Sequence, residues 1–149
     1  MQKSVLVFAI ISLVCVGFAL TLTTYSAINV STNINSSGSI TTSPNIGAFY
    51  DSACTTAVSS VTWGSVSAGG VTSQTVYIKN TGTGTIALSL ATSAWNPAGA
   101  ATYITVSWNQ QGTQLPAGQS VAATITLTVA PSITGITSFS NTMTISGTG

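Results

Sequence analysis

The stretch ATITLTV, residues 123–129, sets Ile125, Leu127 and Val129 at alternate positions with threonine between them. Successive side chains of a β-strand point to opposite faces, so this pattern predicts a strand with one apolar face and one hydroxyl-bearing face. Threonine, isoleucine and valine are β-branched and favour strands. We therefore expect this segment to lie in a sheet that has one face buried.

Four further segments show the same two-residue period, namely VYIKN, TIALSL, YITVSW and TMTIS, at residues 76–80, 85–90, 103–108 and 142–146. Turn-forming groups rich in Gly, Asn and Pro separate the strands, namely SAGG, NTGTG, NPAG and LPAGQ, at residues 67–70, 80–84, 96–99 and 115–119. Short strands between turns predict a mainly β fold, an Ig-like antiparallel sandwich of about seven strands over residues 46–149. The large side chains expected in its core are Trp63, Trp95, Trp108 and Phe139.

Charged side chains are almost absent, since Lys3, Asp51 and Lys79 are the only ones in 149 residues and there is no histidine. Soluble domains usually carry about a quarter charged residues. A net charge near zero promotes self-association. Without a basic patch, neither nucleic acid nor an anionic lipid headgroup is expected as a partner. Folding stability should depend little on pH, because few groups bind protons.

The same inventory argues against an enzyme. Asp51 is the only carboxylate side chain, so a two-carboxylate mechanism has no second member. Cys54 has no imidazole to activate it, and one thiol with one carboxylate cannot hold zinc or iron. We expect no catalytic residue, no cofactor and no metal site. Asp51 is expected as a solvated charge, as a partner of Lys79, or as an acceptor for turn backbone, and Cys54 as a small buried residue.

An apolar N-terminal run from Val5 to Leu22 has 18 residues, the lower limit for a helix that spans a bilayer. We expect a leader at residues 1–4 and a hydrophobic helix at residues 5–27. The segment has three interpretations: a cleaved signal peptide with the mature chain starting near Ala27, a retained anchor, or a pilin-type helix that loses only MQKS. All three place the remaining chain outside the cytoplasm. The helix side chains expected to carry assembly are Val5, Leu6, Phe8, Ile10, Ile11, Leu13, Val14, Phe18, Leu20 and Leu22.

Residues 28–45 are polar, contain Gly and Pro, and lack a helical period, which predicts a linker or an extended strand. Two N-glycosylation sequons occur there, at Asn29 and Asn35. We expect these asparagines as the sites for attached glycans.

Five longer segments carry a resemblance to known proteins, namely FYDSACTTAVSSVTWGSV, VYIKNTG, WNP, LPAGQS and SITGITSFSNTMTISG, at residues 49–66, 76–82, 95–97, 115–120 and 132–147. Together they resemble small surface proteins of thermophilic archaea. An apolar N-terminal helix before a charge-poor, Ser/Thr-rich sandwich is similar to archaeal type IV pilins, which form adhesive and often glycosylated pili. It is less similar to archaeal threads and bundling pili, in which an N-terminal strand completes the sandwich of the next subunit.

The resemblance implies a structural subunit of an extracellular archaeal filament, a homopolymer whose N-terminal segment lies in the membrane before assembly. Residues 5–22 would carry assembly, and the exposed head would serve adhesion. In the strand-donating alternative, residues 27–40 would be laid into a neighbour's sheet. The remaining alternatives are a membrane-anchored surface module and a sugar-binding module, for which Trp95 is the aromatic residue best placed at a strand end.

Overall fold

The computed structural model describes residues 33–42 and 45–149, which form nine strands and one short helix. The expected leader and the expected hydrophobic helix at residues 5–27 lie outside these residues. The strands of the described region are β1 (Asn33–Thr42), β2 (Ile46–Phe49), β3 (Ser60–Ser67), β4 (Val71–Asn80), β5 (Ile86–Asn96), β6 (Ile104–Trp108), β7 (Gln114–Leu115), β8 (Ser120–Val129) and β9 (Ser138–Thr148), and the helix is α2 (Ala100–Tyr103).

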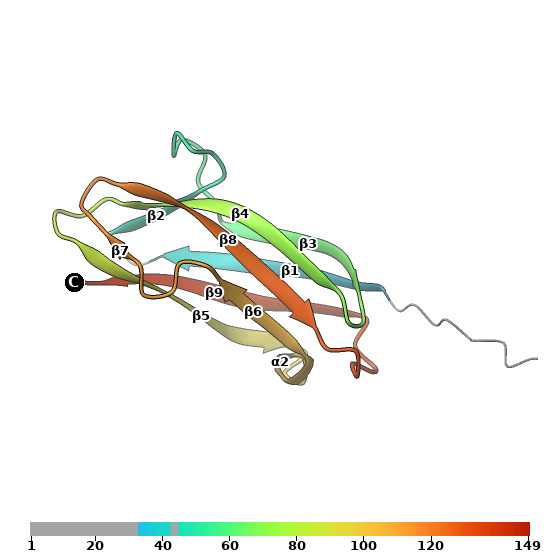
Figure 1. The fold of residues 1–149 in the computed structure, drawn as a ribbon. Coiled ribbons are helices and arrows are strands. Elements are labelled where there is room, and N and C mark those ends of the chain that lie inside the picture. The colour runs from blue at the N-terminus through green and yellow to red at the C-terminus, as the bar shows by residue number, and fades with distance from the viewer. Residues whose placement is uncertain (1–32, 43–44) are drawn as a thin grey trace, which may run out of the picture. The chain divides into compact units, whose positions relative to one another are not determined.

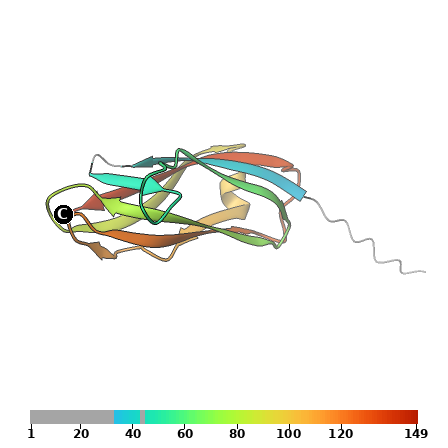
Figure 2. The same cartoon turned by 90° about the horizontal axis from the view of Figure 1, so that it is seen from above.

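Two sheets form a sandwich-like arrangement, as the two views in Figures 1 and 2 show. One sheet has five strands in the order β3-β1-β9-β5-β7, and the other has four in the order β2-β4-β8-β6. Neighbouring strands are antiparallel with one exception, because β1 runs parallel to β9, and their arrows point the same way in Figure 1. The expectation of a wholly antiparallel sandwich is therefore wrong for this pair.

The core lies between the inner faces of the two sheets and follows the alternation seen in the sequence. In β8 the side chains of Ile125, Leu127 and Val129 are buried, whereas Thr128 is exposed. In β4, Val76 and Ile78 are buried in the same way. Burying apolar area contributes roughly 25 cal/mol per Å², so these alternating positions supply most of the driving force for pairing the sheets.

All five strands predicted from alternation are confirmed, in β4, β5, β6, β8 and β9, although β5 begins at Ile86 and Tyr103 is the last residue of α2. The predicted turns also fall between strands or at their ends. Residues 28–45 were expected as a linker or a strand, and residues 33–42 form β1 inside the five-stranded sheet. The sandwich therefore includes chain on the N-terminal side of residue 46.

The four large aromatic side chains divide into two groups. Trp63 and Phe139 are buried, as expected. Trp95 and Trp108 are only partly buried and pack against the edge of the core. The ring of Trp95 stacks on that of Phe139 with 5.8 Å between centroids, and Trp108 donates its indole N–H to Gln111 Oε1 at 2.9 Å. The helix of the described residues, α2, has only four residues and is too short to span a bilayer.

The buried side chain of Asn80 joins the β4–β5 loop to β7 at one end of the sandwich. Its Nδ2 donates to the carbonyl oxygens of Gly84 and Leu115, at 2.7 and 2.9 Å, and its Oδ1 accepts from the Gly82 N–H at 2.9 Å. The NTGTG turn thus begins with a side chain that is fully buried and fully hydrogen-bonded. Such a satisfied amide holds the β4–β5 loop against β7.

We predict that Asn80→Leu lowers the free energy of unfolding by roughly 3 kcal/mol, because the variant leaves three backbone groups without their partner. Urea unfolding followed by tryptophan fluorescence measures this loss. The control is Asn109→Leu, which removes one exposed acceptor, that of the Thr124 N–H, and should cost less than about 1 kcal/mol. Equal losses in the two variants would contradict the role assigned to Asn80.

Candidate functional site

The sequence-predicted site residues fall in two places. The ten assembly side chains between Val5 and Leu22, and the sequon at Asn29, lie outside the described residues. Asn35 lies in β1, with an exposed side chain whose Oδ1 accepts a hydrogen bond from Ser65 Oγ at 2.8 Å. Of the predicted site residues, only Asn35 therefore has a described environment, which β1 and its neighbouring strands form.

Strand β1 is an interior strand of its sheet, although it is the first strand of the described chain. It pairs antiparallel with β3, from Asn33 opposite Ser67 to Ser39 opposite Ser60. On its other edge it pairs parallel with β9, from Asn35 opposite Ser138 to Thr42 opposite Ile145. Both edges of β1 are thus hydrogen-bonded, and without β1 the facing edges of β3 and β9 would have no partner strand.

The inward face of β1 contributes four buried residues, which are Ile34, Ser36, Gly38 and Ile40. The two isoleucines anchor the strand at its ends, and the centre of this face is small. The outward face carries hydroxyls instead. Ser39 and Thr142 Oγ atoms lie 3.3 Å apart, and the hydroxyls of Thr41 and Thr144 lie 3.2 Å apart. This outer hydroxyl ladder ties β1 to β9 without any charge.

Every buried side-chain polar atom without a hydrogen-bond partner in the described residues belongs to β1 or to a strand that flanks it. These atoms are Ser36 Oγ in β1, Trp63 Nε1 in β3, and both amide atoms of Asn141 in β9. An unpartnered buried polar group costs about 1–3 kcal/mol. In the described residues, the free-energy cost of buried polar atoms without hydrogen bonds is therefore concentrated around β1.

The register between β1 and β3 contains a bulge opposite Ser36 and Ser37. Gly64 pairs with Ser36 and adopts a φ of +69°, in the left-handed region that favours glycine. The next paired residues are Thr62 and Ser37, so Trp63 is the extra residue of the bulge. The bulge lies beside the small central residues of β1.

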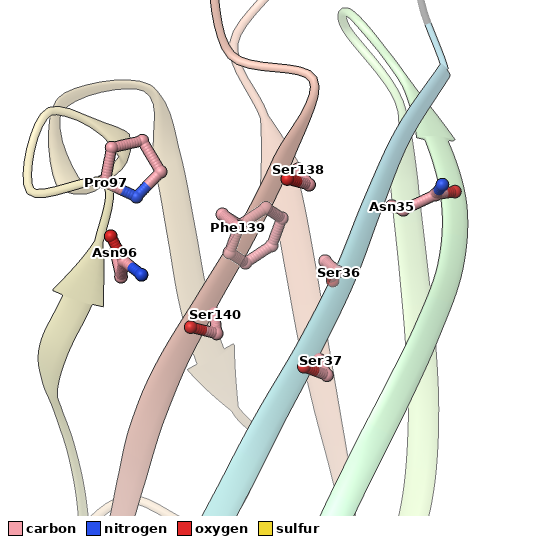
Figure 3. A pocket seen from close by; sticks show the side chains of 8 residues that line it. All are labelled: Asn35, Ser36, Ser37, Asn96, Pro97, Ser138, Phe139 and Ser140. Carbon is pink, nitrogen blue, oxygen red and sulfur yellow. The ribbon is translucent and has the colours of Figure 1, made fainter.

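A shallow hollow of about 540 Å³ lies where β1, β9 and the end of β5 meet. Figure 3 shows Ser138, Phe139 and Ser140 of β9 beside the side chains of β1, with Asn96 and Pro97 on the other side of β9. The lining is neutral, with hydroxyl and amide groups. Stacking on a sugar requires an exposed aromatic face, and the one aromatic residue of the lining, Phe139, is only 4% exposed. This lining does not support a sugar platform, and Trp95 is not part of it.

Asp51 closes the loop between β2 and β3. Its Oδ2 accepts from the Thr56 N–H at 2.7 Å, and its Oδ1 accepts from the N–H and the hydroxyl of Thr55, at 3.0 and 3.1 Å. These hydrogen bonds, led by the one from the Thr56 N–H, hold the pKa of Asp51 below its ordinary value of 3.8. Of the three expected roles, fixing a turn through backbone is confirmed.

The remaining reactive side chains are not brought together. Among the described residues, no ion pair joins Asp51 to Lys79, and no group of three His, Cys, Asp or Glu side chains forms a metal cluster. Cys54 is a free thiol in the Asp51 loop. The expectation that Cys54 is buried is wrong, because its side chain is partly exposed. Its backbone takes a φ of 55°, in the left-handed region.

Comparison of the chain with protein-family models and with curated proteins finds no match. The described region therefore defines a class by its architecture alone, a mainly β, sandwich-like protein with a first strand inserted between β3 and the last strand.

We predict that the Asp51→Asn variant loses the acid dependence of folding stability. A carboxyl whose pKa is lowered by folding stabilises the fold above its unfolded pKa, and that contribution disappears as the pH falls through the lower folded pKa. The wild-type chain should therefore unfold at a constant temperature from about pH 7 to about pH 4 and at a lower one in stronger acid. Thermal unfolding across this range, with Ser52→Asn as control, measures the effect. An Asp51→Asn variant that keeps the wild-type acid response would contradict it.

Proposed function

We propose that this chain is a structural subunit of an extracellular filament built from copies of itself, and that β1 is the element passed between neighbouring copies. The observation that carries the proposal is the place of β1. It is the first strand of the described chain, and it lies in the interior of a sheet with both edges paired. A strand with that position can complete either its own sheet or the equivalent sheet of a second copy.

Exchange of β1 preserves its contacts, because the same residues of β3 and β9 would receive the same strand from another copy. Only residues 43–45 connect β1 to β2, and short connections favour exchange of an element between copies. The unpartnered polar atoms around β1 lower the free-energy cost of withdrawing it from its own sheet, and the same cost recurs in the receiving sheet, so they ease its release. These features support release of β1 and its insertion elsewhere.

Head-to-tail donation produces an open chain of subunits. Each copy gives its β1 to one neighbour and receives β1 from another, so the contact does not close on itself unless the rotation between copies forms a ring. The near-absence of charge supports the same proposal, since little repulsion opposes close approach of identical surfaces. The resemblance to archaeal filament subunits with an Ig-like head, and to strand-donating ones among them, points in the same direction.

A second candidate assembles through the N-terminal helix, as in archaeal type IV pilins. The observation that favours it is the uncharged apolar run from Val5 to Leu22, since a helix that is apolar on all sides requires lipid or neighbouring helices around it. In this version β1 stays in its own subunit. The two versions share an extracellular homopolymer and differ in the segment that carries it.

Asn35 is compatible with a glycan in either version. The side chain is exposed on the outward face of β1, whereas the core contacts of the strand are made by its inward face. A sugar on Asn35 would therefore project from the sheet and leave the pairing of β1 with β9 unchanged. We propose Asn35 as a glycan acceptor on the surface of the filament.

We predict that an engineered disulfide between β1 and β9 links different subunits. The pair is Ser39→Cys with Thr142→Cys, whose hydroxyls lie 3.3 Å apart, in a Cys15→Ser/Cys54→Ser background. After oxidation of assembled material, a non-reducing gel should show a ladder of covalent multimers. The control combines Ser39→Cys with Thr128→Cys, an exposed position in the other sheet, and should give no ladder.

A covalent monomer from the first pair, in material that electron microscopy shows to be filamentous, would contradict strand donation and favour the helix version. Material that contains no filaments under any condition would contradict both.

We predict that the mature subunit begins near Ala27, because strand donation requires β1 near a free N-terminal arm. Mass spectrometry of filaments from the native host measures this end directly. A mature chain that begins at Val5 would favour the pilin version, and a chain that retains Met1 would favour a membrane-anchored module.

A further inference from the structure

We infer that the groove between β3 and β9 accepts a strand that carries glycine opposite Asn141, and that Gly38 and Asn141 together set the register at which β1 of a second copy enters. This inference rests on the proposed exchange of β1 and adds the feature that makes the exchange selective.

Gly38 has no room for a side chain. A Cβ atom placed on it would lie 2.9 Å from Asn141 Oδ1 and 2.7 Å from Met143 Cε. Real side chains do not approach so closely, and therefore a neighbour would have to shift. The end of Met143 is flexible and can move, whereas Asn141 is buried with a short side chain. Asn141 is therefore the neighbour that excludes a side chain from the β1 position opposite it.

The buried amide of Asn141 lowers the stability of the fold. Its side chain is 4% exposed, and neither Oδ1 nor Nδ2 has a hydrogen-bond partner among the described residues. An apolar residue of similar size would avoid this cost. Since the amide gains no hydrogen bond in the observed pairing, Asn141 selects the register through its volume, which penalises any β1 residue that carries a Cβ opposite it.

Sliding β1 along β9 shows which pairings Asn141 penalises. A slide of one residue turns the polar outward face of β1 into the core. A slide of two residues keeps the inward face inside but brings Ser36 or Ile40 opposite Asn141, and each carries a Cβ where Gly38 has none. Only the observed register places glycine at this point.

Control of register by Gly38 and Asn141 is needed most when β1 comes from another copy. Within one chain, the short connection at residues 43–45 already limits how far β1 can slide. A strand donated by a second copy has no such connection to the sheet that receives it. Its position must be set by the groove, and the interior contacts of Gly38 with Asn141 provide that control.

The first experiment measures register in assembled material. In the Cys15→Ser/Cys54→Ser background, Thr142→Cys is combined in turn with Ser37→Cys, Ser39→Cys or Thr41→Cys. With Asn141 present, only the Ser39→Cys pair should give a disulfide ladder, since Ser39 is the β1 residue opposite Thr142. With Asn141→Ala, ladders from the two flanking pairs should increase about tenfold. Flanking ladders that do not depend on Asn141 would overturn the inference.

The second experiment does not depend on assembly. Gly38→Ala should lower the unfolding temperature of the full-length chain by a few degrees, although alanine in place of glycine ordinarily stabilises a compatible site. Adding Asn141→Ala should restore it, and the control Ser39→Ala, which loses only an exposed hydroxyl contact with Thr142, should lower it less than Gly38→Ala does. If the unfolding temperature does not recover in the double variant, the inference that Gly38 and Asn141 set the register is overturned. A compensated Gly38→Ala variant whose Ser39→Cys/Thr142→Cys pair yields only monomers overturns the proposed strand donation instead.

Discussion

The sandwich depends on the insertion of β1 between β3 and β9. This strand joins an antiparallel edge on one side to a parallel edge on the other, and it completes the five-stranded sheet. Its inner face combines isoleucines at the ends with Ser36 and Gly38 in the middle. The strand is therefore held by backbone pairing along its whole length and by apolar burial mainly at its ends.

The polar groups of the molecule are arranged without charge. Outward faces carry hydroxyl pairs such as Ser39 with Thr142, and the one carboxylate side chain is used to close a loop. Such a surface hydrogen-bonds water and neighbouring chains over a wide pH range, because it has almost nothing to titrate. These properties suit the proposed filament subunit, in which identical surfaces meet repeatedly outside the cell.

Alternation in the sequence was sufficient to predict five strands, their turns and the burial of side chains such as Leu127 and Ile78. The candidate site was only partly predictable. Residues 28–45 were recognised as a linker or a strand, but Ser36 and Gly38 carry no apolar signal. The alternation of Phe139, Met143 and Ile145 places residue 141 on the inward face of β9, but a polar asparagine at that position carries no apolar signal of its own.

By itself, the sequence determined the mainly β class, the positions of the strongly alternating strands, and the scarcity of groups for proton transfer or metal binding, because these follow from residue types and local periodicity. The tertiary structure decided that β1 enters the interior of a sheet, that it runs parallel to β9, and that Gly38 lies against Asn141. These features join residues about one hundred positions apart, and no local pattern specifies a contact at that separation.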